Sequence, residues 1–405
     1  MNPWRGLRGL PREVWVVAAA TLINRAGTMV LPFLVLYLTQ GLGFSVEQAG
    51  LTLTIYGIGA LITAPISGRL SDKIGALRIM KWSLFMSGVI LLLFPLARSL
   101  GAVLAITISW AITSEAVRPA SMAIISSLVA PEQRKAVFAL NRLVINLGMS
   151  VGPAIAGFLA LVSFQFLFVV DGATSLLAAV VLALMLRIPV PQTATEATGE
   201  LSLKPKRRLG ALADRRVLFF LAAMLPVELV LFQTQGAMPL FLVRDLSFPA
   251  FAYGLLLAIN TVIIIFVEVP LNTAMQNWPH HRAMALGALL FGLGFGALAF
   301  TDSIIGVGAT VVVWTFGEMV LFPSGSAYVA EIAPPERLGT YMGLYTMTFS
   351  AAFMIGPWLG LFALEQLGAR VLWCATLATG LISATMLWRL PSTGEAIRTE
   401  GEPAT

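Results

Sequence analysis

Long apolar runs separated by short polar breaks make up most of the chain. A helix needs about 20 mainly apolar residues to cross a bilayer, and the pattern predicts twelve membrane spans. They cover residues 13–38, 46–68, 78–97, 101–124, 137–160, 164–187, 217–242, 250–273, 283–300, 304–327, 338–364 and 370–389. The first span follows a basic start, but it is too long for a signal peptide and other spans follow at once. The chain is therefore predicted to be an all-α membrane protein.

One longer polar interruption, residues 188–216, divides the spans into six and six. Its Pro, Thr, Glu and basic residues are typical of a linker. We therefore expect an N-terminal six-helix bundle at residues 1–187 and a C-terminal six-helix bundle at residues 217–390. Residues 391–405 are polar and are expected to form a cytoplasmic tail.

Composition supports a membrane protein. Hydrophobic residues make up 58% of the chain and charged residues only 11%, whereas soluble domains are about 25% charged. The mean hydropathy is +0.87. This balance argues against a soluble enzyme, a nucleic-acid-binding protein and a disordered scaffold.

The distribution of basic residues predicts the orientation. Lys and Arg concentrate in cytoplasmic loops. With the N-terminus inside, most of the 26 basic residues fall on the inner side, and only Arg98, Arg244 and Arg370 fall outside. We expect a multi-pass protein of the cell (inner) membrane with both termini in the cytoplasm. The net charge of +6 then follows from topology, and no nucleic-acid partner is needed.

The two halves resemble each other. In the first, Trp110, Glu115, Pro119 and Gly152-Pro153 follow in order; in the second, Trp314, Glu318, Pro323 and Gly356-Pro357 follow about 203 residues later. Internal repeats of six spans are typical of secondary transporters, whose substrate site lies near the midplane between the repeats. The repeat therefore predicts transport.

Two motifs resemble those of the major facilitator superfamily. After the second span, Gly68, Asp72, Lys73, Gly75 and Arg78 resemble its loop signature, although Ala76 and Leu77 stand where a basic pair would begin. In the fifth span, Gly148 to Gly157 is similar to the glycine-proline motif of drug:proton antiporters, with Ala156 in place of one glycine. The resemblance covers almost the whole chain and implies two pseudo-symmetric six-helix bundles.

Both motifs are candidate gating elements. Asp72 is expected just before the third span, where a helix N-terminus favours a carboxylate, and it could pair with Arg134 as a cytoplasmic latch. The alternative is that this loop only sets topology. Gly152 would allow close backbone approach, and Pro153 would kink the helix. Ordinary close packing is the alternative for this segment.

Ionisable side chains inside spans are costly, by roughly 2.5–3.5 kcal/mol on insertion scales. We single out seven: Arg25, Glu115, Arg118, Arg142, Glu228, Glu268 and Glu318. The superfamily resemblance implies that spans one, four, seven and ten line the central cavity. Arg25, Glu115, Glu228 and Glu318 lie on those four spans.

These positions give the expected site. A carboxylate that meets water on one side and an apolar cavity on the other can bind and release a proton, so Glu115, Glu318 and Glu228 are the proton-coupling candidates. Arg25 would supply a cation to the cavity. The expected substrate-binding residues are Arg25, Asn24, Gln233, Gln235 and Asn260.

No cofactor or metal is expected. The single cysteine, Cys374, and the adjacent His280 and His281 make a poor ligand set for a metal. A membrane-embedded enzyme would need a metal cluster or a nucleophile–base pair, and the sequence suggests neither.

The predicted function is proton-coupled efflux of small amphipathic molecules by alternating access. The expected partners are a small-molecule substrate, protons and the lipid bilayer, and the expected state is a monomer. Two alternatives stay open: a proton-coupled importer or facilitator of a specific metabolite, and a lipid or lysolipid translocator.

Overall fold

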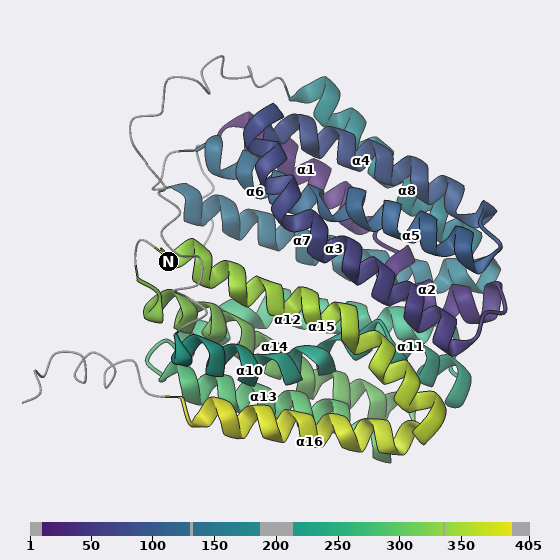
Figure 1. The fold of residues 1–405 in the computed structure, drawn as a ribbon, viewed down its shortest axis with the longest axis vertical. Coiled ribbons are helices and arrows are strands. Elements are labelled where there is room, and N and C mark those ends of the chain that lie inside the picture. The colour runs from purple at the N-terminus through teal and green to yellow at the C-terminus, as the bar shows by residue number, and fades with distance from the viewer. Residues whose placement is uncertain (1–9, 130–132, 187–213, 335–336, 391–405) are drawn as a thin grey trace, which may run out of the picture. The chain divides into compact units, whose positions relative to one another are not determined.

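The computed structural model describes residues 10–129, 133–186, 214–334 and 337–390, and every regular element in these ranges is helical (Figure 1). Eleven of the described helices are long and apolar enough to cross a membrane. Their ends lie within a few residues of the expected spans. The span expected at 46–68 falls in helix α3 (Val46–Ile74), which is not among the eleven. The number twelve therefore stays a prediction.

The chain divides into two compact units. The first comprises Met1–Ser202 with Ser247–Val262, and the second comprises Leu203–Leu246 with Ile263–Thr405. The division falls in the expected linker, but the first half of α12 (Ala250–Ala274) belongs to the first unit. Most of the expected linker and the whole expected tail lie outside the described residues.

In the first unit, helix α1 packs against α7 and α8, α4 packs against α8, and α3 packs against α5. Besides α3 and the first half of α12, the elements of this unit are α1 (Arg12–Ala26), α2 (Val30–Leu36), η2 (Tyr37–Gly41), α4 (Ala76–Leu93), η3 (Phe94–Leu96), α5 (Leu100–Glu115), α6 (Val117–Ser127), α7 (Arg134–Val162) and α8 (Gln165–Met185).

The second unit repeats this pairing: α10 packs against α15 and α16, and α13 packs against α16 (Figure 1). Its elements are α10 (Arg215–Leu231), η5 (Phe232–Thr234), α11 (Ala237–Leu240), η6 (Phe241–Asp245), α13 (His280–Ala297), η7 (Leu298–Phe300), α14 (Ile304–Ile332), α15 (Leu338–Leu367) and α16 (Ala369–Trp388), together with the second half of α12.

Core packing follows the repeat as well. In the first unit the Tyr37 ring meets the Phe168 ring edge-on, with centroids 4.6 Å apart. In the second unit Phe241 meets Trp373 in the same way at 5.3 Å. Each pair joins the end of the unit's first span to its last span. Aromatic pairs in this geometry contribute about 0.5–1.5 kcal/mol beyond the area that they bury.

The first span of each unit is interrupted. In the first unit α1 ends at Ala26 and α2 begins at Val30, and in the second unit α10 ends at Leu231 and α11 begins at Ala237. An interrupted helix leaves backbone N–H and C=O groups without intrahelical partners. In transporters such discontinuous helices commonly form the substrate and ion sites.

Candidate functional site: a polar cavity at the break in the first span

A buried carboxylate binds the backbone at the break between α1 and α2. Asp171 of α8 is 4% exposed, and its Oδ2 atom accepts hydrogen bonds from the backbone N–H groups of Met29 and Val30, each at 3.1 Å. The first N–H groups of a helix have no partner within the helix, and they carry its partial positive charge. Asp171 therefore stabilises the start of α2 and holds α8 against the break.

A cavity of about 70 Å³ lies beside this contact, inside the first unit. Asn24 and Arg25 from α1, Glu115 from α5, Tyr56 from α3 and Asp171 from α8 contribute side chains to its lining. The structure thus brings together three of the side chains that sequence predicted for the site: Asn24, Arg25 and Glu115. A polar cavity of this size has room for water molecules.

Hydrogen bonds hold several of these side chains in place. The Tyr56 hydroxyl donates to Glu115 Oε1 at 2.8 Å and lies 3.1 Å from the Ser114 hydroxyl. Asn24 Nδ2 donates to the Ser175 hydroxyl at 3.0 Å. In the described part of this unit, Arg25 forms no ion pair with Glu115 or Asp171, although all three line one cavity.

In the second unit, Glu228 of α10 is fully buried. Its Oε1 atom accepts a hydrogen bond from the Thr348 hydroxyl of α15 at 3.0 Å. Its Oε2 atom is also buried and has no hydrogen-bond partner among the residues that the structure describes. A buried carboxyl oxygen without a hydrogen-bond partner is costly.

The other predicted site residues are dispersed. Gln233 is held by backbone: its Nε2 atom donates to the carbonyl oxygens of Gly356 at 2.8 Å and Leu229 at 3.0 Å. Gln235 is half-buried beside the break after α10, and Glu318 is half-buried in α14. Asn260 is 9% exposed and lies in the half of α12 that belongs to the first unit.

The glycine-proline segment of α7 packs directly on the break in the first span. A Cβ atom added to Gly148 would lie 2.5 Å from the Arg25 Cβ, and one added to Gly152 would lie 3.0 Å from the Ala26 carbonyl oxygen. Close approach of this kind requires glycine. The segment therefore contacts the backbone that carries Arg25.

The second unit has the corresponding contact. A Cβ atom added to Gly356 would lie 3.2 Å from the Leu229 carbonyl oxygen, and one added to Gly236 would lie 2.7 Å from the Pro357 Cα. Gly356 and Pro357 correspond to Gly152 and Pro153 in the repeat. In both units the glycine-proline pair therefore lies against the interrupted first span.

The structure describes part of the loop motif at residues 68–78. Gly68 and Lys73 lie in α3, Gly75 separates α3 from α4 with φ +92°, and Arg78 is exposed on α4. The expectation that Asp72 precedes a helix is wrong: residue 72 lies in the last turn of α3, because the helix continues to Ile74 and ends at Gly75. The Asp72 and Arg134 side chains lie outside the described residues, so their pairing stays a prediction.

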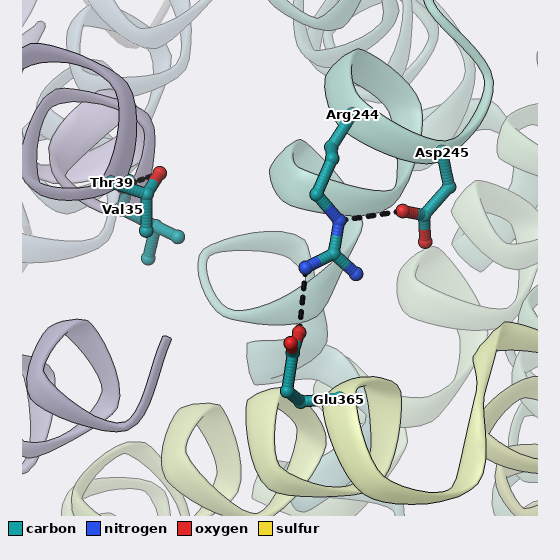
Figure 2. A network of polar contacts seen from close by, with 5 residues as sticks. All are labelled: Val35, Thr39, Arg244, Asp245 and Glu365. Atoms are coloured by element: carbon teal, nitrogen blue, oxygen red, sulfur yellow. Dashed lines mark hydrogen bonds and ion pairs between the residues drawn. The ribbon is translucent and has the colours of Figure 1, made fainter. Parts of the chain in front are cut away.

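An ion-pair network joins two elements of the second unit. Arg244 Nε contacts Asp245 Oδ1, and Arg244 Nη1 contacts Glu365 Oε2, each at 2.6 Å (Figure 2). All three side chains are about a third exposed. Arg244 thereby connects η6 to α15 at the end of the span that follows the break.

Sequence reasoning missed Asp171. The signal was available, because Asp171 is a lone carboxylate within an apolar run and meets the same criterion as the seven residues singled out. Its role in capping α2 could not be read from the sequence. Tyr56, which donates to Glu115, and Thr348, which donates to Glu228, carried no comparable signal in the sequence.

Comparisons with known proteins are consistent with this architecture. The sequence profile of the Major Facilitator Superfamily matches residues 17–320 and 234–404. The chain is 24% identical over 375 residues to an uncharacterized MFS-type transporter, YqjV, of Bacillus subtilis, covering 91% of this chain and 90% of that protein. It is 24% identical over 368 residues to a Na(+), Li(+), K(+)/H(+) antiporter of Planococcus maritimus, covering 83% and 85%.

A shorter match joins the chain to the quinolone resistance protein NorA of Staphylococcus aureus, at 26% identity over 165 residues, covering 41% of this chain and 42% of that protein. Among solved structures, the nucleoside transporter NupG superposes with a TM-score of 0.78 at 13% identity, covering 94% and 99%. At this identity the likeness shows the fold alone. Because the superfamily profile matches nearly the whole chain, the protein belongs to the Major Facilitator Superfamily and is a membrane transporter, not an enzyme.

Proposed function

We propose that the protein exports small amphipathic molecules in exchange for protons by alternating access. The observation that carries this proposal is the cavity at the first-span break, which Arg25, Glu115 and Asp171 line together. Three ionisable side chains around one small cavity inside a membrane bundle would be too costly to keep without a function. Transporter sites also form where spanning helices are interrupted.

Glu115 and Asp171 are the proposed proton carriers of the first unit, and Glu228 is that of the second. The Tyr56 hydroxyl donates to Glu115, so the tyrosine can stabilise the ionised carboxylate and release it on protonation. Arg25 places a positive charge at the same cavity as these carboxylates. A cationic or zwitterionic substrate whose charged group reaches this cavity would compete with the proton for these carboxylates.

Glu318 stays a proposed coupling residue because it corresponds to Glu115 in the repeat. For substrate binding we propose Arg25 and Asn24, both at the cavity, with Gln235 and Asn260 as further contacts. Gln233 is a weaker candidate, because its amide nitrogen already bonds two backbone carbonyls.

The proposed gating elements are the glycine-proline segments and the loop after α3. Gly152 lies on the backbone of Arg25 to Thr28, so a movement of α7 would be transmitted directly to the break. A latch between Asp72 and Arg134 would act at the cytoplasmic side. These roles assume cytoplasmic termini and a monomer in the cell membrane.

Export is proposed partly from the relatives. One is named an antiporter of monovalent cations and protons, and another is named a quinolone resistance protein. The alternative is a proton-coupled importer or a facilitator of a specific metabolite, which the polar lining of the cavity favours. A lipid or lysolipid translocator is a third possibility with the same fold.

Purified protein in liposomes with an imposed pH gradient tests the proposal. Substrate flux should be followed for a quinolone, a lipophilic cation, a nucleoside, a sugar, Na⁺ and K⁺, with the gradient in either direction. Export coupled to proton entry requires that an amphipathic compound moves against its gradient and that a protonophore stops it. Flux of a polar metabolite down the proton gradient would favour import, and gradient-independent flux of every compound would contradict coupling.

A further inference from the structure

A large apolar groove lies on the second unit, between α13 and α16. Its volume is about 850 Å³, which falls in the range of small-molecule sites. It is lined by Asn277, Trp278, Pro279, Arg282, Ala285, Leu286, Leu289, Leu381, Ala384, Thr385, Trp388 and Arg389. It shares no lining residue with the cavity at the first-span break.

The groove runs along two candidate membrane spans, from their ends toward their middles. Its rim lies where the candidate span His280–Phe300 begins and the span Ala369–Trp388 ends. Leu289 is nine residues into the first of these helices, so at 1.5 Å per residue the apolar floor extends roughly 13 Å inward. On the opposite wall, Leu381 lies seven residues before the end of the span Ala369–Trp388, so that wall is apolar over a similar length.

The rim is basic and aromatic. Arg282 and Arg389 are both exposed, and Trp278 and Trp388 are 48% and 59% exposed. The Arg282 guanidinium carbon lies 5.6 Å from the centre of a Trp388 ring, a cation–π contact that orients the charge without neutralising it. None of the lining residues, all of which the structure describes, is acidic.

Two further features favour an anion at this rim. Helix α13 begins at His280, directly after Pro279 of the rim, and no side chain caps its first turn, so its N-terminus adds partial positive charge. The adjacent acidic side chain, Glu331, is engaged by His280 at 3.4 Å. Indole rings also prefer the level of lipid headgroups.

We propose that this groove binds one anionic phospholipid, with an acyl chain along Leu286, Leu289 and Leu381 and the phosphate between Arg282 and Arg389. Charge complementarity and the apolar floor together require an amphiphile with a negative head. The distribution of basic residues places this end of the unit in the cytoplasmic leaflet, which carries anionic lipids. A second groove, on the first unit, is lined by Ile62, Ile66 and Trp82 among others and has a volume of about 250 Å³. None of its lining residues is charged, so it should not distinguish lipids by the charge of their headgroups.

Native mass spectrometry of the full chain tests the site. The delipidated protein is titrated with dioleoyl phosphatidylglycerol, with dioleoyl phosphatidylcholine, and with glycerol phosphate, which has the charge without the acyl chains. We expect the first lipid to be retained at the lowest concentration and glycerol phosphate not to be retained. Equal retention of the two lipids, or retention of glycerol phosphate, would overturn the proposal.

Variants locate the binding. Arg282→Gln and Arg389→Gln should each weaken phosphatidylglycerol retention about fivefold and phosphatidylcholine retention less, because its choline already balances the phosphate charge, whereas Arg282→Lys should keep most of the binding. Arg370→Gln, at the other end of α16 and also exposed, is the matched control and should behave as the unmodified protein.

A further variant tests the apolar floor of the groove. Leu381→Trp, at a position 42% exposed, should fill the groove and weaken the retention of both lipids. An unchanged preference in both arginine variants, or an equal loss in Arg370→Gln, would show that the anionic lipid binds elsewhere.

Discussion

The Ser67 hydroxyl donates a hydrogen bond to the carbonyl oxygen of Ala116, 3.0 Å away and directly after Glu115. Asn272 makes the corresponding contact in the second unit, where its Nδ2 atom donates to the carbonyl oxygen of Met319 at 3.1 Å, directly after Glu318. In each unit the second span thus holds the backbone next to the repeat-related glutamate. The two glutamates share a supporting contact as well as a place in the repeat.

This contact should stabilise both units. Ser67→Ala removes the side-chain donor from the Ala116 carbonyl, which keeps the Ala120 N–H as a backbone donor, so the free energy of unfolding should fall by about 0.5–1.5 kcal/mol. Asn272→Ala should cost a similar amount. Thermal unfolding in detergent measures both, and Ser109→Ala is the control, because that exposed hydroxyl bonds only within its own helix. Equal melting temperatures in all three variants would contradict the supporting role.

Asp171 should serve both structure and coupling. Asp171→Asn keeps an oxygen that can accept from Met29 and Val30, so it should fold like the unmodified protein but lose pH-driven transport. Asp171→Ala removes the acceptor and should lower the free energy of unfolding by about 1–3 kcal/mol. Melting temperature and proteoliposome flux separate the two effects. Normal pH-driven flux in Asp171→Asn would leave Asp171 with a structural role only.

A methyl group at Gly148 should disturb the break in the first span. Gly148→Ala would bring its Cβ to 2.5 Å from the Arg25 Cβ, so α7 must move away, and we expect a loss of about 1–3 kcal/mol from overpacking and reduced transport. Gly101→Ala and Gly308→Ala are matched controls within helices, because a Cβ at either position meets nothing within 4 Å. These controls should be neutral or slightly stabilising. A Gly148→Ala variant that resembles them would contradict the close approach.

The Arg244 network should be weak and salt-dependent. Exposed ion pairs contribute about 0–1 kcal/mol, so Arg244→Gln should lower the melting temperature slightly in low salt. Screening should remove the difference at about 1 M salt, where the Debye length is about 3 Å. Arg98→Gln, outside this network, is the control. A large loss that persists in high salt would mean that Arg244 acts through something other than the contacts to Asp245 and Glu365.

Sequence patterns predicted the helical architecture well, because membrane spans are defined by length and hydrophobicity alone. The repeat also identified Trp110 and Trp314, which are buried in corresponding helices. The site was only partly predictable. Arg25, Asn24 and Glu115 meet at one cavity. The two hydrogen bonds that Asp171 accepts from the Met29 and Val30 N–H groups depend on how α8 lies against the break.

At two positions the local surroundings differ from what the sequence suggests. Gln233 lies on a span that the superfamily resemblance expects to line the cavity, yet its amide nitrogen donates to the Gly356 carbonyl oxygen, a contact set by the packing of α15 that no local pattern reveals. Asp72 was expected before a helix because the apolar run begins at residue 78. The preceding helix instead continues through this polar segment until Gly75.

The central claim is that carboxylates in the two units couple proton movement to substrate movement. The most direct measurement compares pH-driven transport with substrate exchange at equal pH for Glu115→Gln and Glu228→Gln in proteoliposomes. Each change removes the titratable group and keeps the side chain's size. Loss of pH-driven transport with preserved exchange in at least one variant is the result that proton coupling predicts. Unchanged pH-driven transport in both variants would contradict it.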